Sequence, residues 1–132
     1  MKIKNLIFTL LLTFSISFSL ESKDLEIAWE SEKKFELPES VIFDENNEVL
    51  YVSNIVNHPF KKDASGYISK LSLEGEIIDL KWISKLNAPK GLTIVDGKLF
   101  IADVDELVEV DIESGKIIKK HKGVGAVCFN DV

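Results

Sequence analysis

The sequence predicts an all-β fold, specifically a β-propeller built from four-stranded antiparallel blades. Short apolar segments alternate with turn residues from residue 25 onward, which indicates strands joined by tight turns. The stretch at residues 37–54, LPESVIFDENNEVLYVSN, returns at residues 89–103 as PKGLTIVDGKLFIAD and begins a third time at residues 129–132 as FNDV. Four antiparallel strands that recur every 40 to 50 residues are typical of propeller blades.

The expected strands follow from this pattern in chain order. The first repeat contains expected strands at residues 41–43, 49–53, 67–73 and 77–82, and the second contains them at residues 92–95, 99–104, 107–112 and 117–121. Residues 41–43 are apolar throughout, which favours a strand covered on both faces. Turn residues separate the strands, at residues 44–48, Glu74-Gly75, Asp96-Gly97 and Ser114-Gly115. Residues 25–30 alternate as well and are compatible with an isolated edge strand.

The two repeats can be aligned position by position. Ser40 matches Gly91 at an offset of 51 residues, and Leu50 matches Leu99 at an offset of 49. Ile68 matches Leu107 at an offset of 39, and Gly75 matches Gly115 at an offset of 40. A β-sandwich of independent strands is the alternative fold, but a sandwich has no reason to repeat its turn chemistry.

The predicted propeller domain, residues 20–132, is incomplete. It holds about two blades and the first strand of a third, whereas propellers close with about four to eight blades. We therefore expect the chain to correspond to the front portion of a longer propeller.

Residues 1–19 have the layout of a secretory signal peptide. Lys2 and Lys4 precede an apolar run at residues 6–18, and Ser17 and Ser19 supply the small residues of a cleavage site. An uncleaved anchor is the alternative, but the run is shorter than the roughly 20 apolar residues of a membrane-spanning helix. The expected location of the mature protein is periplasmic or secreted, with no membrane contact beyond the signal peptide.

The charge balance argues against a nucleic-acid partner. The chain has a net charge of −6 and no Arg, and removal of Lys2 and Lys4 with the signal peptide moves the net charge to −8. Nucleic-acid binding needs a basic stripe instead. The single Cys128 excludes an internal disulfide, and its apolar neighbours favour a buried small hydrophobe over a nucleophile.

The blade motifs resemble those of a known family. The opening LPESVIFD followed by LYVSN is similar to the first blade of the senescence marker protein/gluconolactonase/luciferin-regenerating enzyme family, and FNDV is similar to its Asn-Asp motif. The resemblance spans residues 25–132, and the APKGL…LFIAD unit is also typical of the related NHL-type propellers.

The resemblance implies a six-bladed propeller with a divalent metal, usually calcium, at the mouth of its central channel. Glu39 matches the family's first-blade metal ligand, and Asn130 matches the residue that contacts substrate or water. The remaining ligands and the catalytic Asp of the family would lie beyond Val132, so the catalytic residues are unknown. The family's Glu-Gly-Pro opening is Glu-Ser-Val here, which affects the expected lactonase chemistry more than the expected fold.

The alignment of the repeats with one another indicates the same positions independently of the family resemblance. Glu39, Lys90 and Asn130 each precede an expected innermost strand, and such positions ring one end of a propeller channel. A ring of oxygen atoms suits calcium, although Lys90 would repel a metal, and Glu39 is otherwise a solvated carboxylate. Asn54 and Asp103 end matching strands and are interpreted as turn caps.

Two functions follow as expectations. The first is a metal-dependent hydrolase of lactones or similar esters that acts on a small-molecule substrate. The alternative is a non-catalytic extracytoplasmic propeller that binds a ligand or protein on its channel face.

Overall fold

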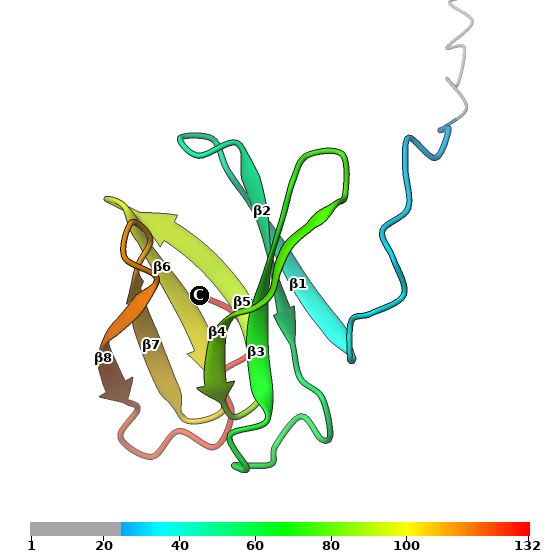
Figure 1. Cartoon of the computed structure of the whole chain (residues 1–132). Coiled ribbons are helices and arrows are strands. Elements are labelled where there is room, and N and C mark those ends of the chain that lie inside the picture. The colour runs from blue at the N-terminus through cyan, green and yellow to red at the C-terminus, as the bar shows by residue number, and fades with distance from the viewer. Residues whose placement is uncertain (1–24) are drawn as a thin grey trace, which may run out of the picture.

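Residues 25–132 form two four-stranded antiparallel sheets in the computed structural model, which describes this part of the chain (Figure 1). The predicted all-β class is therefore confirmed. Over the described range there is no helix, and hence none that is long and apolar enough to cross a membrane. The predicted signal peptide at residues 1–19 lies outside the described residues.

All eight expected strands are present, in two sheets with the simple orders β1-β2-β3-β4 and β5-β6-β7-β8. The first sheet contains β1 (Pro38–Asp44), β2 (Val49–Asn54), β3 (Gly66–Leu71) and β4 (Ile77–Leu86). The second contains β5 (Pro89–Val95), β6 (Lys98–Asp103), β7 (Glu106–Asp111) and β8 (Lys116–Lys122). The strands β1 and β5 begin three residues earlier than expected, each at a proline, which a strand tolerates at its first residue.

The strand registers confirm the repeat. Ser53 pairs with Ile68 in the first sheet, and Ala102 pairs with Leu107 in the second, so the offsets read from the sequence hold in space. Both innermost strands also carry an irregularity at the same place, between Pro38 and Val41 in β1 and between Pro89 and Leu92 in β5. The two sheets therefore share their strand order and the irregularity of their innermost strands, whereas the pairing of their outermost strands differs.

The predicted turn chemistry is confirmed as well. Asp96 and Gly97 have φ angles of 49° and 72°, as a two-residue hairpin of the type I′ requires. Gly75 and Gly115, at the equivalent turns between third and fourth strands, have φ angles of 84° and 63°. A side chain with a Cβ is strained in this region, and glycine is not.

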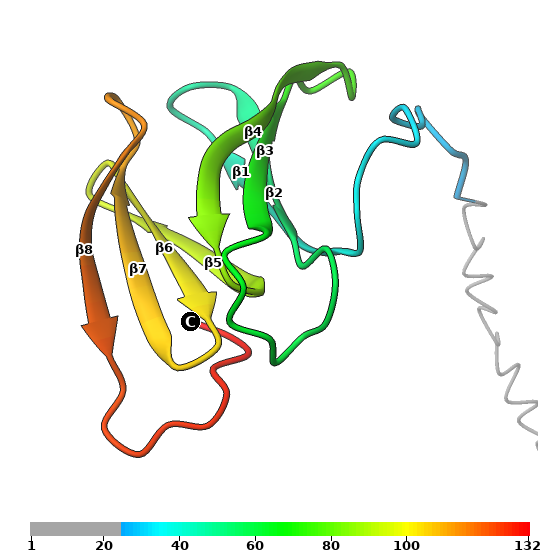
Figure 2. The same cartoon turned by 60° about the horizontal axis from the view of Figure 1, so that its bottom comes forward.

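The main core lies between the two sheets (Figure 2). Alternate residues of β2 and β3 face the second sheet, and alternate residues of β6 and β7 face back. The fully buried members of this core are Tyr51, Ile68, Leu86, Leu99, Ile101, Val108 and Val110. The strand β5 packs against β1 and β2, so the innermost strands of the two sheets lie next to each other.

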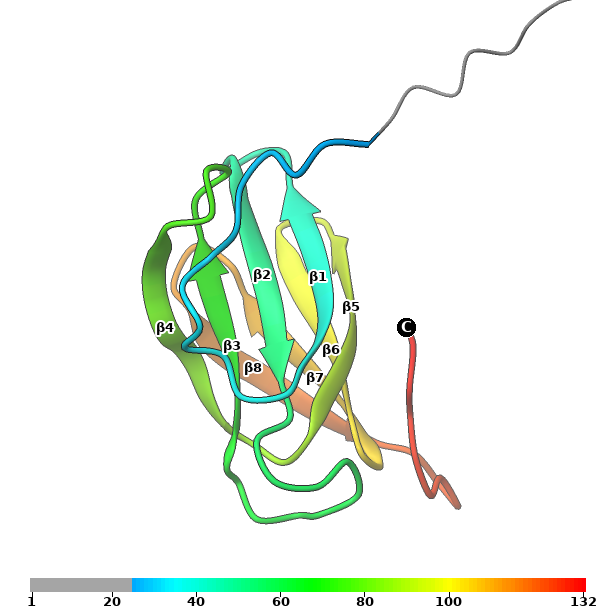
Figure 3. The same cartoon turned by 90° about the vertical axis from the view of Figure 1, so that its right-hand side faces the viewer.

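Two expectations about strands were wrong. Val41 and Phe43 were expected to be covered on both faces of their strand, but they are 61% and 46% exposed because only the opposite face of β1 packs on the second sheet. Residues 129–132 were expected to begin another strand, but residues 128–132 have no regular structure. The N-terminal segment, residues 25–37, runs across the outer face of the first sheet without becoming a strand (Figure 3).

Candidate functional site

The predicted site residues gather at the end where the two innermost strands begin. Glu39 is the second residue of β1 and Lys90 the second residue of β5, so both lie inside strands and not just before them. The C-terminal segment joins them, because the amide nitrogen of Gly91 donates a hydrogen bond to the carbonyl oxygen of Asn130 at 2.8 Å. Glu39, Lys90, Asn130 and Asp131 are called the inner-strand cluster below.

A difference between the two repeats explains why the C-terminal segment binds to β5. In the first sheet the amide of Ser40, the equivalent of Gly91, donates to the hydroxyl of Ser53 at 3.0 Å. The residue equivalent to Ser53 is Ala102, which has no hydroxyl. The Gly91 amide therefore has no side-chain acceptor in its own sheet, and the Asn130 carbonyl supplies one.

Gly91 also provides the space for this contact. A Cβ at Gly91 would lie 2.7 Å from the Cα of Asp131 and 2.8 Å from the carbonyl oxygen of Asn130. Both are backbone atoms that cannot move without displacing the whole segment. The glycine is therefore required for close approach and not for an unusual φ angle.

Charges interact within the inner-strand cluster. The pKa of the Glu39 carboxyl is raised, first by partial burial and then by the negative charge of Asp131, while the positive charge of Lys90 lowers it. Asp131 is a member that the sequence reasoning did not name as a site residue. The sequence feature that could have identified Asp131 is its position directly after Asn130 in the FNDV motif.

Lys90 is buried, and hydrogen bonds fix the position of its ammonium group. Its side chain is only 3% exposed, and its Nζ donates to the carbonyl oxygen of Ala88 at 2.9 Å. The amide of Ala88 in turn donates to Oδ1 of Asp103 at 2.7 Å, and the amide of Asn87 donates to Oδ2 at 2.9 Å. The chain from Asp103 through Ala88 fixes the ammonium group near the start of β5.

Asp103 caps backbone amides as predicted, but those amides lie in the link before β5 and not in the turn after its own strand. Its side chain is fully buried, and burial raises the pKa of its carboxyl, an effect opposed by the hydrogen bonds from Asn87 and Ala88. The equivalent Asn54 is also buried and donates from Nδ2 to the Val52 carbonyl and to the Ser69 hydroxyl, both at 3.1 Å. Its Oδ1, however, has no hydrogen-bond partner in the described part of the chain.

The inner-strand cluster does not by itself fit a calcium ion. It contains two carboxylates and one exposed amide, whereas calcium takes six to eight oxygen ligands. The buried ammonium of Lys90 also repels a cation. Among residues 25–132 no three His, Cys, Asp or Glu side chains are grouped so that they could hold a metal ion. Glu39 is therefore at most one ligand of a larger site.

A hollow of about 320 Å³ lies at the opposite end of the sheets from the inner-strand cluster, among hairpin turns. Two of the acids that line it accept hydrogen bonds within turns: Asp44 accepts from the amides of Asn46 and Asn47, and Asp111 accepts from the amide of Ser114. Cys128 is half-buried, in partial agreement with the prediction of a packed hydrophobe.

Comparison with family models, with curated proteins and with solved structures found no match to this chain.

Proposed function

We propose that the two sheets are successive blades of a gluconolactonase-like β-propeller. The support is the equivalence of the sheets in strand order, bulges and turn glycines. The innermost strands lie next to each other, as strands that line a central channel do.

We further propose that the inner-strand cluster binds a small hydroxylated molecule, such as a sugar lactone or a similar ester. The observation that carries this proposal is the convergence of Glu39, Lys90, Asn130 and Asp131 at one end of the sheets. Carboxylates accept hydrogen bonds from hydroxyl groups, an amide both donates and accepts, and the buried ammonium of Lys90 adds a fixed positive charge beside them. Such a set suits an uncharged polar ligand better than an ion of either sign.

We also propose that this ligand is hydrolysed. A divalent metal such as calcium, bound partly by Glu39, would polarise the ester carbonyl. The raised pKa of Glu39 suits a carboxylate that shares protons with a ligand. Because the cluster lacks a complete set of metal ligands, we expect no hydrolysis from residues 25–132 alone.

A non-catalytic propeller that binds a ligand or protein is the second candidate. The buried ammonium of Lys90 favours it, because a fixed cation near Glu39 takes the electrostatic role that a metal would otherwise have. Both candidates include export through the signal peptide, and mass spectrometry of the protein from an envelope fraction would establish the mature start.

Titration of the isotope-labelled chain with methyl glucoside, followed by amide NMR, tests the binding proposal. We expect shifts at Gly91 and Asn130 that saturate with ligand, and that weaken in the variants Glu39→Gln and Asp131→Asn. The matched control is Asp96→Asn, an acid removed at the opposite end of the sheets. Shifts that survive Glu39→Gln but vanish in Asp96→Asn would place the ligand elsewhere and refute the proposal.

A further inference from the structure

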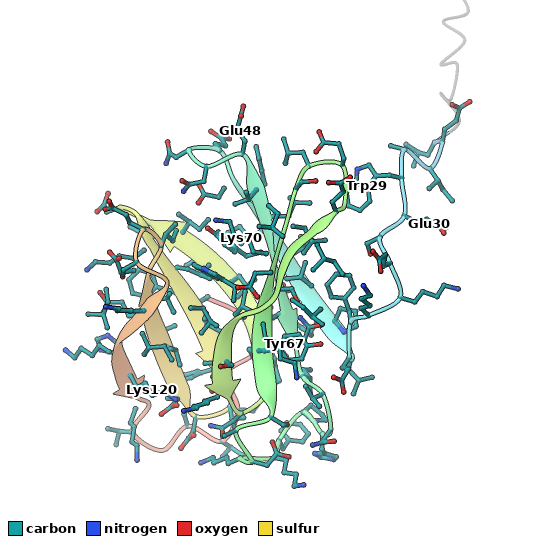
Figure 4. All side chains as sticks on the ribbon, viewed as in Figure 1. Trp29, Glu30, Glu48, Tyr67, Lys70 and Lys120 are labelled. Atoms are coloured by element: carbon teal, nitrogen blue, oxygen red, sulfur yellow. The ribbon has the colours of Figure 1, made fainter. Side chains whose placement is uncertain are left out.

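The last strand of the second sheet, β8, concentrates positive charge in an acidic protein. Its seven residues, KIIKKHK, contain four lysines, one histidine and no acid, whereas the whole chain has a net charge of −6. None of the other seven strands of residues 25–132 contains more than two lysines. Figure 4 shows Lys120 on this strand, on the opposite side of the molecule from Trp29. The strand therefore presents a local basic surface.

Most of this charge is not neutralised within the described part of the chain. Lys120 donates from Nζ to Oε1 of Glu106 at 2.6 Å. The side chains of Lys116, Lys119 and Lys122 are exposed and form no ion pair with any of residues 25–132. Three ammonium groups on one strand are thus available to a negatively charged partner.

The backbone of β8 is also open along one edge. The strand pairs with β7 and is the last strand of its sheet, so its other edge faces no strand of residues 25–132. Residues 119–122 pair regularly with β7, and the irregularity in this pairing lies at Ile118. An open edge presents unpaired N–H and C=O groups to an added strand. Lysines on an edge repel another basic strand, so this edge selects an acidic one.

A second hollow, of about 420 Å³, lies between this strand and β4. Its apolar lining comes from the indole of Trp82 and from Ile83 and Ile117, and its charged lining comes from Lys85 and Lys116. Apolar surface flanked by two ammonium groups suits an apolar side chain whose neighbours in the sequence are acidic. The hollow therefore matches the charge preference of the open edge.

Backbone strain at Lys85 is an independent observation at the same hollow. Lys85 has a φ angle of 62°, in the left-handed region that residues other than glycine rarely adopt. It lies near the end of β4, whose pairing with β3 is irregular. Strained residues of this kind gather at binding sites, where the surrounding structure holds them in place.

We infer that β8 is a docking strand for an acidic protein segment in extended conformation. The segment adds to the open edge at residues 119–122, places an apolar side chain against Trp82 in the hollow, and directs its carboxylates to Lys116 and Lys119. A membrane surface or another polyanion would satisfy the ammonium groups but would leave the backbone edge and the apolar hollow unused. The open edge and the hollow therefore favour a peptide.

This inference goes beyond the proposed function and depends neither on the propeller nor on the ligand of the inner-strand cluster. Failure of the glucoside titration would leave it intact, and its own failure would leave the ligand proposal intact.

A designed peptide tests the docking strand. The probe is acetyl-EVEFEVE-amide, titrated into the isotope-labelled full chain. We expect saturable NMR shifts at the amides of residues 116–122 and at the indole N–H of Trp82, while the indole N–H of Trp29 stays unchanged. The control has the same sequence and charge but a methyl group on every backbone amide nitrogen, and we expect it to produce no shifts.

Three outcomes of this titration would overturn the inference. Equal shifts with the methylated peptide would show that charge alone is recognised. Shifts of the β8 amides with phosphatidylglycerol vesicles, and none with the probe, would identify a membrane as the partner. Shifts that depend on chain concentration alone would identify a second copy as the occupant.

Charge reversal on β8 tests the role of its lysines. Lys116→Glu and Lys119→Glu, both at exposed positions, should each weaken binding of the probe by about fivefold or more. The matched control is Lys33→Glu, an exposed lysine of the N-terminal segment, which makes the same change in net charge and should alter binding by less than about twofold. Unchanged amide shifts outside β8 verify that each variant is folded. Equal weakening by all three variants would show that binding follows net charge and would overturn the inference.

Discussion

Trp82 of β4 stacks on Tyr51 of β2, with ring centroids 4.5 Å apart and ring planes inclined by 22°. The same indole lies against Gly115 of the second sheet, and the Nζ of Lys70 lies 6.0 Å from its ring centroid. The backbone of Trp82 is thus part of the first sheet, whereas its side chain contacts the second sheet. The contact links β2, β4 and the turn that precedes β8.

Loss of this side chain is expected to separate the sheets. Trp82→Ala should lower the free energy of unfolding by about 2–3 kcal/mol, because a large, half-buried aromatic group loses its packing against the main core. Trp29→Ala is the matched control, since Trp29 is 44% exposed and should cost about 1 kcal/mol or less. Urea unfolding followed by circular dichroism measures both. A larger loss for Trp29 would show that the interface between sheets is not the main source of stability.

The charges of the inner-strand cluster can be tested one at a time by carboxyl NMR. Asp131→Asn should lower the pKa of Glu39, because it removes a neighbouring negative charge, and Lys90→Met should raise it, because it removes a positive one. Glu113→Gln, at the opposite end of the sheets, serves as the control and should leave it unchanged. A pKa of Glu39 that is insensitive to Asp131→Asn would mean that the C-terminal segment does not lie beside β1.

Lys90 should also set the affinity of the cluster for calcium. We expect weak binding by the natural chain, and a roughly tenfold or greater gain for Lys90→Asn, because the change removes a repelling charge and adds an amide oxygen. Calorimetric titration with calcium measures the difference. Equal affinity of the two chains would contradict the assignment of Lys90 to the same site as Glu39.

The buried Asp103 should make stability depend on pH in a defined direction. Its folded-state pKa is raised above the ordinary 3.8, so the folded chain binds a proton more tightly than the unfolded chain. The associated stabilisation is complete below the unfolded pKa and is lost as pH rises through the folded pKa. Relative to Asp103→Asn, the natural chain should therefore lose stability as pH rises through the acid range. Urea unfolding of both chains at a series of pH values measures the difference in their free energies of unfolding. A gain in the stability of the natural chain relative to Asp103→Asn as pH rises would contradict the prediction.

Gly91→Ala should release the C-terminal segment, because the new Cβ meets the backbone of Asn130 and Asp131. We expect exchange of the residue 91 amide to accelerate by about tenfold or more, which corresponds to at least 1.4 kcal/mol for the contact. Val127→Ala is the control, since Val127 lies in the same C-terminal segment and is 84% exposed, and it should leave that amide unchanged. Hydrogen exchange read by NMR distinguishes the two, and unchanged exchange in Gly91→Ala would refute the contact.

Properties that depend on near neighbours in the chain could be predicted from the sequence. Short apolar segments bounded by turn residues located the eight strands, because a strand and the turn that ends it are both set by residues close together in the chain. Asp96-Gly97 predicted a tight hairpin because few residues accept two positive φ angles in succession. The place of Asp103 at the end of a strand predicted a cap for backbone amides, but the amides that it accepts from, those of Asn87 and Ala88, belong to the link before β5 and not to the turn after its own strand.

Contacts between residues far apart in the chain were decided by the tertiary structure. The sequence did not indicate that Asp131 lies beside Glu39, or that Lys90 is buried, since both depend on how β5 packs between β1 and the C-terminal segment. It also predicted two covered faces for Val41 and Phe43, and one of them is open. An apolar strand pattern indicates which side chains can be buried. Only the packing of one sheet on another determines which side chains are buried, because burial requires a surface supplied by a distant part of the chain.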